Sequence, residues 1–237
     1  MAMSRRGHTL IELVIYFFLS VAAGLIVLQL FLLAQRSGDR AYATYLVSGN
    51  MATTIRMIRK ELQATSLASV TSYGSTAGQA PGFSCVSAYD DKGEFQLGAY
   101  GTPHWQKHVY YTLDTKGAIS RWTTDIADKN FLPTLAADPG APDASTGKVL
   151  MQDALPPNQA VGSSKDPDKW HPASSYGGLE VGFLRRDNAS ETVVPENPRD
   201  STEPEKNTPL IQVVVRLFEA ERGPNFMEIK FRVAPRY

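Results

Sequence analysis

The N-terminal part of the chain contains a long hydrophobic run. Residues 13–35 carry no charged side chain and read LVIYFFLSVAAGLIVLQLFLLAQ. About 20 apolar residues in a helix cross the roughly 30 Å hydrocarbon core of a bilayer, so this run is long enough to span a membrane. Arg5 and Arg6 precede it, which favours a cytoplasmic N-terminus and an exported remainder.

Beyond residue 36 the pattern changes from apolar all round to amphipathic. Five apolar residues form one stripe at spacings of four and three, namely Val47, Met51, Ile55, Ile58 and Leu62. Arg56, Arg59 and Lys60 lie mostly away from this stripe. All 15 prolines lie at Pro81 or beyond. Because proline is the strongest helix breaker, we expect one uninterrupted helix from about residue 9 to about residue 67.

From residue 83 onward the pattern predicts β-strands. Runs rich in β-branched and aromatic residues occupy residues 83–89, 94–100, 108–113, 118–124, 179–184, 210–218 and 226–233. The turn chemistry of residues 114–117 and 221–225 predicts two hairpins. Long polar stretches, which predict loops, occupy residues 133–147, 156–178 and 186–209. The expected fold class is α+β, with a long N-terminal helix packed on an antiparallel β-sheet head.

Composition excludes some classes of function. Lysine plus arginine equals aspartate plus glutamate at 24 each, so no basic surplus favours nucleic acid as a partner. The single cysteine, Cys85, allows neither an intrachain disulfide nor a cysteine-based zinc set. In its strand-like context we expect Cys85 to be a small buried apolar residue.

The sequence offers no catalytic set and no cofactor motif. His104 and His108 are four residues apart, but their context is strand-like and no third ligand is evident, so we expect no metal site. Residues 90–94 and 114–117 are acidic turns that lack the further ligands a calcium site needs. Three tryptophans could form an adhesive surface, but aromatic residues in strands are usually core residues; they are Trp105, Trp122 and Trp170.

Three interpretations of the N-terminus compete. A secretory signal peptide has an apolar region of about 7–15 residues followed by a small-residue cleavage site, which this longer run lacks. A signal anchor needs only basic residues before the hydrophobic run and a run long enough to span the membrane. Glu12 is a further feature, because a carboxylate within the bilayer costs about 2.5–3.5 kcal/mol on insertion scales. It either reaches water at the edge of the span or pairs with a cation from another chain, since residues 13–35 contain no basic side chain.

The segment Arg5-Arg6-Gly7 followed by HTLIELV resembles the N-terminal signature of type IV prepilins and the related pseudopilins. The resemblance implies that a prepilin peptidase cuts the Gly7–His8 bond and N-methylates His8, which stands where the family usually has an apolar residue. It also implies that Glu12, the fifth mature residue, neutralises the N-terminal amine of a neighbouring subunit. Such a pair would set the register between subunits, because a buried acid or amine left alone is heavily penalised.

The head also resembles one branch of this family. The segment MIRKELQA at residues 57–64 is similar to the helix end of W-type minor pilins and J-type pseudopilins. So are VYYTL at residues 109–113, ISR at residues 119–121 and the closing FRVAPR. The resemblance implies a pilin-like fold.

These features predict four segments: a cleaved leader at residues 1–7, a transmembrane and filament-core helix at 8–36, an amphipathic helix at 37–70, and a β-rich globular head at 71–237. The predicted function is that of a minor pilin without enzymatic activity or cofactor, which helps to initiate pilus assembly within a tip complex. Its implied partners are the prepilin peptidase, other minor pilins or pseudopilins, the major pilin, the inner-membrane assembly platform and membrane lipid.

The predicted location is the inner membrane before assembly, with the N-terminus cytoplasmic, and a periplasmic or cell-surface pilus afterwards. One alternative is a J-type minor pseudopilin of a type II secretion system. Another is a signal-anchored periplasmic binding protein or enzyme, which would keep its N-terminus uncut and tolerate Glu12→Ala.

Overall fold

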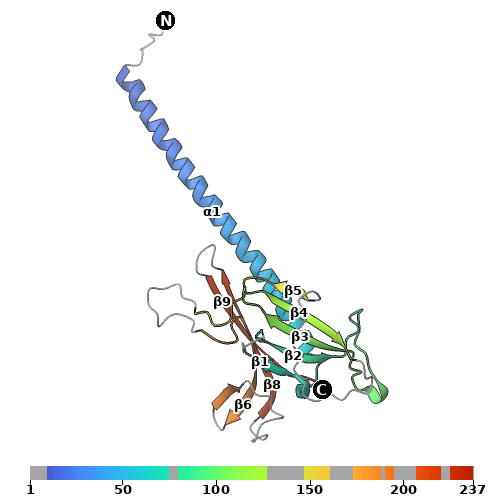
Figure 1. Ribbon diagram of the computed structural model, residues 1–237. Coiled ribbons are helices and arrows are strands. Elements are labelled where there is room, and N and C mark those ends of the chain that lie inside the picture. Colours follow the sequence, from blue (N-terminus) through green and yellow to red (C-terminus); the bar gives the residue numbers. More distant parts are fainter. Residues whose placement is uncertain are drawn as a thin grey trace. The chain divides into compact units, whose positions relative to one another are not determined.

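The computed structural model describes residues 10–74, 80–126, 147–160, 173–187, 190–194, 207–219 and 225–236. The chain divides into two compact units, Met1–Ser48 and Gly49–Tyr237. The described residues form a long N-terminal helix and two antiparallel β-sheets (Figure 1), which confirms the expected α+β class.

The helix α1 runs from Leu10 to Gln63, close to the expected range. It is uninterrupted, as the absence of proline before Pro81 predicts. The backbone N–H of Arg236 donates a hydrogen bond to the carbonyl oxygen of Gln63 at 3.3 Å. This bond satisfies one of the carbonyl groups that a helix end leaves without an intrahelical partner. A short 3₁₀ helix, η1 (Leu67–Ser69), follows.

The last turns of α1, residues 49–63, belong to the second unit and bury one side of the helix. Met51, Ile58 and Leu62 are buried, which confirms the predicted stripe at these positions. The side chain of Val47 lies outside the described residues. Thr54 and Glu61 are also buried on this side, although neither was expected there.

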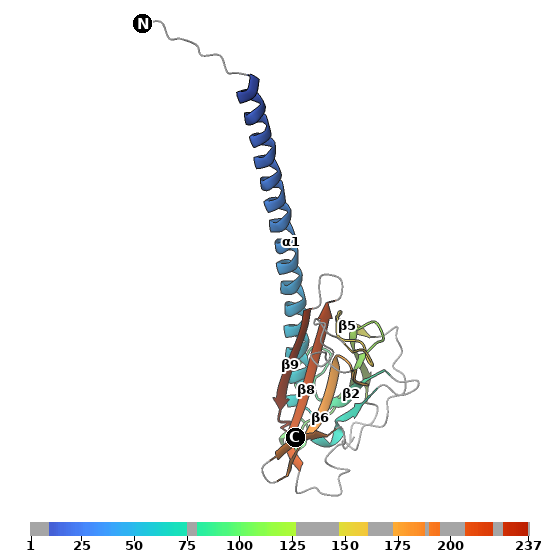
Figure 2. The same cartoon turned by 90° about the vertical axis from the view of Figure 1, so that its left-hand side faces the viewer.

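The second unit contains both sheets. One has the strand order β1-β2-β3-β4-β5 and consists of β1 (Thr71–Tyr73), β2 (Gly82–Ser87), β3 (Lys107–Leu113), β4 (Ile119–Asp125) and β5 (Lys148–Met151). The other has the order β7-β6-β8-β9 and consists of β6 (Leu179–Asp187), β7 (Ser190–Val194), β8 (Asn207–Glu219) and β9 (Asn225–Val233). Figure 2 shows β6, β8 and β9 running side by side.

Most of the strand predictions are confirmed, and three corrections are needed. Residues 94–100 do not form a strand; they make isolated bridges and the 3₁₀ turn η2 (Ala99–Gly101), in which Tyr100 has a φ of 63°. The stretch 186–209, expected to be a loop, contains β7. The short strands β1 and β5 were not expected.

The five-stranded sheet is buried on both faces at its centre, since every residue of β2 is buried. On one face the rings of Phe83 and Tyr111 stack with centroids 4.7 Å apart. Gly82 permits the close approach of β2 and β3, because a Cβ atom at this position would overlap the carbonyl oxygen of Tyr111. The backbone contact therefore requires glycine here.

The turn at residues 114–117 forms the predicted hairpin between β3 and β4. The Asp114 carboxylate accepts hydrogen bonds from the backbone N–H groups of Lys116 and Ala118, both at 2.8 Å. Gly117 has a φ of 87°, which glycine adopts without steric cost. The β8 and β9 strands pair as far as Glu219 and Asn225. The turn predicted between them falls largely on residues 220–224, which lie outside the described part of the chain.

The four-stranded sheet carries a buried arginine. Arg216 on β8 forms ion pairs with Glu228 at 2.7 Å and Glu180 at 2.8 Å, and donates to the carbonyl oxygen of Gly177 at 2.9 Å. Two carboxylates and one carbonyl compensate the buried charge, so this cluster joins β6, β8 and β9.

Candidate functional site

The first candidate site is the apolar part of α1. Leu10–Gln35 forms a helical stretch of 26 residues that is apolar and long enough to cross a membrane, and none of it is buried within the structure. At 1.5 Å per residue it extends about 39 Å, which exceeds the roughly 30 Å hydrocarbon core of a bilayer. Its exposed side chains include large apolar residues on every side, such as Phe17, Phe18, Leu28 and Phe31. A surface of this kind needs lipid or other apolar helices around it.

Glu12 lies in the first turn of α1 and is exposed. It is the only charged residue of Leu10–Gln35. A carboxylate at this end of a helix interacts favourably with the partial positive charge of the unpaired backbone N–H groups. Gly7 and His8, the predicted cleavage and methylation positions, lie outside the described residues.

A second candidate site is a cluster of polar side chains that joins the C-terminal end of α1 to the five-stranded sheet. The buried Glu61 carboxylate accepts a hydrogen bond from the Tyr111 hydroxyl on β3. It also accepts two from the Arg121 guanidinium on β4, at 3.0 Å from Nε and 2.5 Å from a terminal nitrogen. Glu61 is therefore a buried charge with a complete set of donors.

The environment of this cluster changes the pKa of three groups. Burial and the neighbouring Glu61 charge raise the pKa of Tyr111 well above its ordinary value of 10.0. The same two causes, in the same order, raise the pKa of the Cys85 thiol. Burial lowers the pKa of Arg121, but its hydrogen bonds and charge interaction with Glu61 outweigh this, so its pKa lies above the ordinary value. At neutral pH the Arg121 guanidinium is therefore charged, whereas the Tyr111 phenol and the Cys85 thiol are neutral.

Cys85 is fully buried, as the sequence predicts. A neutral buried thiol is a poor nucleophile and a poor metal ligand, since the thiolate is the reactive form. Trp105 and Trp122 are also buried, with 8% of each residue exposed, which confirms the core interpretation for both. Trp170 lies outside the described residues.

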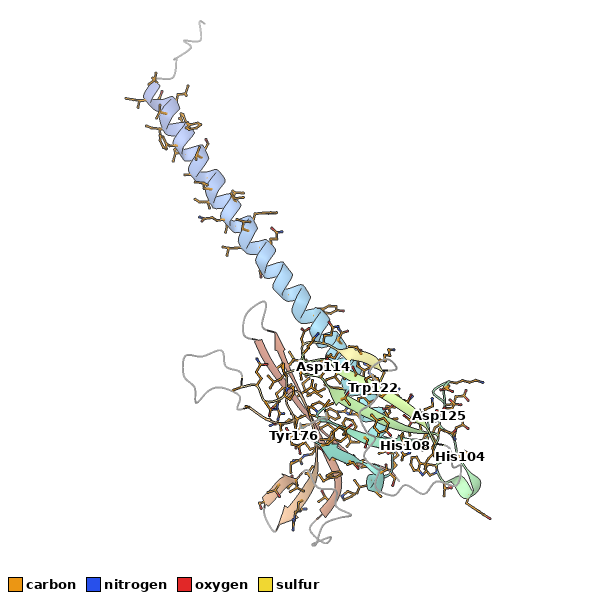
Figure 3. All side chains as sticks on the ribbon, in the orientation of Figure 1. His104, His108, Asp114, Trp122, Asp125 and Tyr176 are labelled. Atoms are coloured by element: carbon orange, nitrogen blue, oxygen red, sulfur yellow. The ribbon has the colours of Figure 1, made fainter. Side chains whose placement is uncertain are left out.

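The two histidines do not share a strand. Figure 3 shows both near the same end of the sheet as Asp125, whereas Asp114 lies at the opposite end. His108 is on β3, and partial burial lowers its pKa. His104 precedes the strand, with its Nδ1 3.0 Å from Nε2 of Gln106. In the described ranges no three His, Cys, Asp or Glu side chains come close enough to hold a metal ion.

The acidic turn at residues 90–94 uses its carboxylate within the fold. Asp90 accepts hydrogen bonds from the backbone N–H groups of Lys92 and Glu94, both at 2.9 Å, and from the Gln96 side chain at 2.8 Å. The bond from Glu94 is the main cause that lowers the pKa of Asp90. This geometry is typical of a turn-forming aspartate.

Comparison with protein-family models, with curated proteins and with solved structures finds no match for this chain. The features of the chain that bear on function are therefore the helix, its single carboxylate and the surface of the second unit.

Proposed function

We propose that this chain is a minor pilin, a membrane-inserted subunit whose leader is removed after Gly7 and whose helix then joins the core of an extracytoplasmic filament. The observation that supports this most strongly is the position of Glu12. It is the only charged residue of a 26-residue apolar helical stretch, and it lies in the first helical turn, five residues after Gly7.

The pairing chemistry follows from the cost of isolated charges. Cleavage after Gly7 would give His8 a free α-amino group next to an apolar helix. When helices of neighbouring subunits pack together, this amine and the Glu12 carboxylate of another subunit can compensate one another. An uncompensated buried charge costs about 3–5 kcal/mol, so the pair selects one register between helices.

The size of the second unit supports a minor rather than a major subunit. Gly49–Tyr237 contains two sheets and several long connections, and such a unit is easier to place at the end of a filament than to repeat along it. We propose a location at or near the tip, with other minor subunits. A pull-down with the full chain tests this location, and failure to bind any other minor subunit contradicts it.

Shearing of surface filaments from native cells tests the role of Glu12. We expect the wild-type chain in the sheared filament fraction and Glu12→Ala only in the membrane fraction. Ser20→Ala, on the same apolar helix, is the matched control and should behave as the wild type does. Equal recovery of Glu12→Ala in filaments would refute the register role.

Shearing together with a secretion assay separates the rival functions. A pseudopilin of a secretion system needs Glu12 but remains in the cell envelope, so neither protein would appear in the sheared fraction and secretion would fail in Glu12→Ala cells. An anchored periplasmic protein would tolerate the substitution in both assays.

A further inference from the structure

A groove of about 560 Å³ lies on the second unit, beside the exposed side of the last turns of α1. The helix contributes Arg56 and Lys60, and the five-stranded sheet contributes Lys148 of β5 together with residues of β3 and β4. A volume of this size falls within the usual range of ligand pockets, about 300–1,000 Å³.

Charge is distributed unequally in the groove. Five cationic side chains line it, and three carboxylates accompany them. Two of the cations are compensated, because Arg121 pairs with Glu61 and Lys107 pairs with Asp91. The third carboxylate, Asp90, is held by the N–H donors of its own turn.

Three cations remain outside these ion pairs, namely Arg56, Lys60 and Lys148, and with Asp90 they leave the groove with two positive charges in excess. In the described part of the chain, no carboxylate forms an ion pair with any of them. The Lys60 ammonium lies over the ring of Tyr89, 4.1 Å from its centroid, so this cation sits above an apolar surface. We call these three side chains and Tyr89 the basic groove.

We propose that the basic groove binds an acidic segment of a partner polypeptide, with spaced carboxylates on the three cations and an apolar side chain against Tyr89. Complementary charge of this kind orients a partner and increases its rate of association. The concave shape favours a polypeptide segment over a flat anionic membrane. The Asp90 carboxylate, which has no cationic partner among the groove residues described above, would repel a continuous negative surface, whereas a polypeptide can place its charges away from it. This inference does not depend on the filament function.

Fluorescence anisotropy with the full chain in phosphatidylcholine nanodiscs tests the proposal. The probe is a labelled peptide of alternating glutamate and glycine, and the reference is the matching peptide of glutamine and glycine. We expect only the acidic peptide to bind, with an affinity that falls as salt is added. Neutralising the three exposed cations (R56Q, K60Q and K148Q together) should weaken binding roughly tenfold.

The matched control neutralises three exposed cations elsewhere on the second unit, K116Q, R186Q and R236Q, and should bind as the wild type does. Equal losses in the two triple variants, or equal binding of the two peptides, would overturn the proposal.

A second experiment repeats the peptide titration with nanodiscs that also contain phosphatidylglycerol. If anionic lipid blocks the peptide on the wild type, the groove binds membrane, and the proposal is wrong. Thermal unfolding of each variant checks that it is folded, and the salt dependence of the wild type alone also tests the proposal.

Discussion

The ion pair between the buried Glu61 carboxylate and Arg121 predicts how much stability the chain loses when Arg121 is replaced. In Arg121→Met, Glu61 keeps the hydrogen bond from the Tyr111 hydroxyl but loses both hydrogen bonds from the guanidinium group. Breaking a buried ion pair by removing one partner costs about 3–5 kcal/mol. Here the Glu61 side chain is 7% exposed and that of Arg121 is 27% exposed. Water can thus partly replace the guanidinium, and we expect a loss of about 2–3 kcal/mol in the free energy of unfolding.

For a unit of this size, 1 kcal/mol corresponds to about 2–4 °C, so we expect Arg121→Met to lower Tm by roughly 4–12 °C. The assay is thermal and urea unfolding of the full chain in detergent, followed by near-ultraviolet circular dichroism. Arg186→Met, at an exposed position on β6, is the control and should change stability by less than about 0.5 kcal/mol.

The double variant E61L/R121M removes both charges and separates this explanation from a simple loss of packing. We expect it to be more stable than Arg121→Met alone, because no uncompensated charge is left in the interior. An unchanged Tm in Arg121→Met would refute this explanation, and so would a loss in the double variant equal to the sum of the losses in E61L and R121M measured singly.

Three further predictions concern the same sheet. Cys85 should resist a thiol reagent such as Ellman's reagent until urea unfolds the chain, because burial raises its pKa; rapid labelling of the native protein would contradict this. Gly82→Ala should cost about 1–3 kcal/mol by urea unfolding, whereas Gly98→Ala, which has room for a Cβ atom, should be close to neutral. Tyr111 has a raised pKa in the folded state. Its contribution to the free energy of unfolding is therefore complete below pH 10 and decreases as pH rises further. The stability advantage of the wild type over Tyr111→Phe should therefore be smaller at about pH 11 than at about pH 8, and a constant difference would contradict it.

The helix and the class of fold were predictable from local patterns. An uncharged run of 23 residues, the absence of proline and the spacing of Met51, Ile58 and Leu62 each act within one helix, so the sequence displays them directly. The turn at residues 114–117 was predictable for the same reason, since Asp114 forms its hydrogen bonds with residues two and four positions away.

Features that depend on distant residues were missed. No local pattern marks Glu61 as a buried acid, because its partners Tyr111 and Arg121 lie 50 and 60 positions along the chain. The basic groove likewise brings Lys148 to a helix residue such as Arg56 only through the pairing of β4 with β5. Residues 94–100 have the composition of a strand, but the left-handed conformation of Tyr100 and the bridges to neighbouring segments replace a regular ladder.

The most direct test of the proposed function is the intact mass of the protein extracted from native membranes. We expect a polypeptide that lacks residues 1–7, begins at His8 and carries one added methyl group on its new N-terminus. In cells without the prepilin peptidase, the full-length mass should return. A mature chain that begins at Met1 in cells with an active peptidase would contradict the proposed function, because no free amine would then lie beside the helix for Glu12 to compensate.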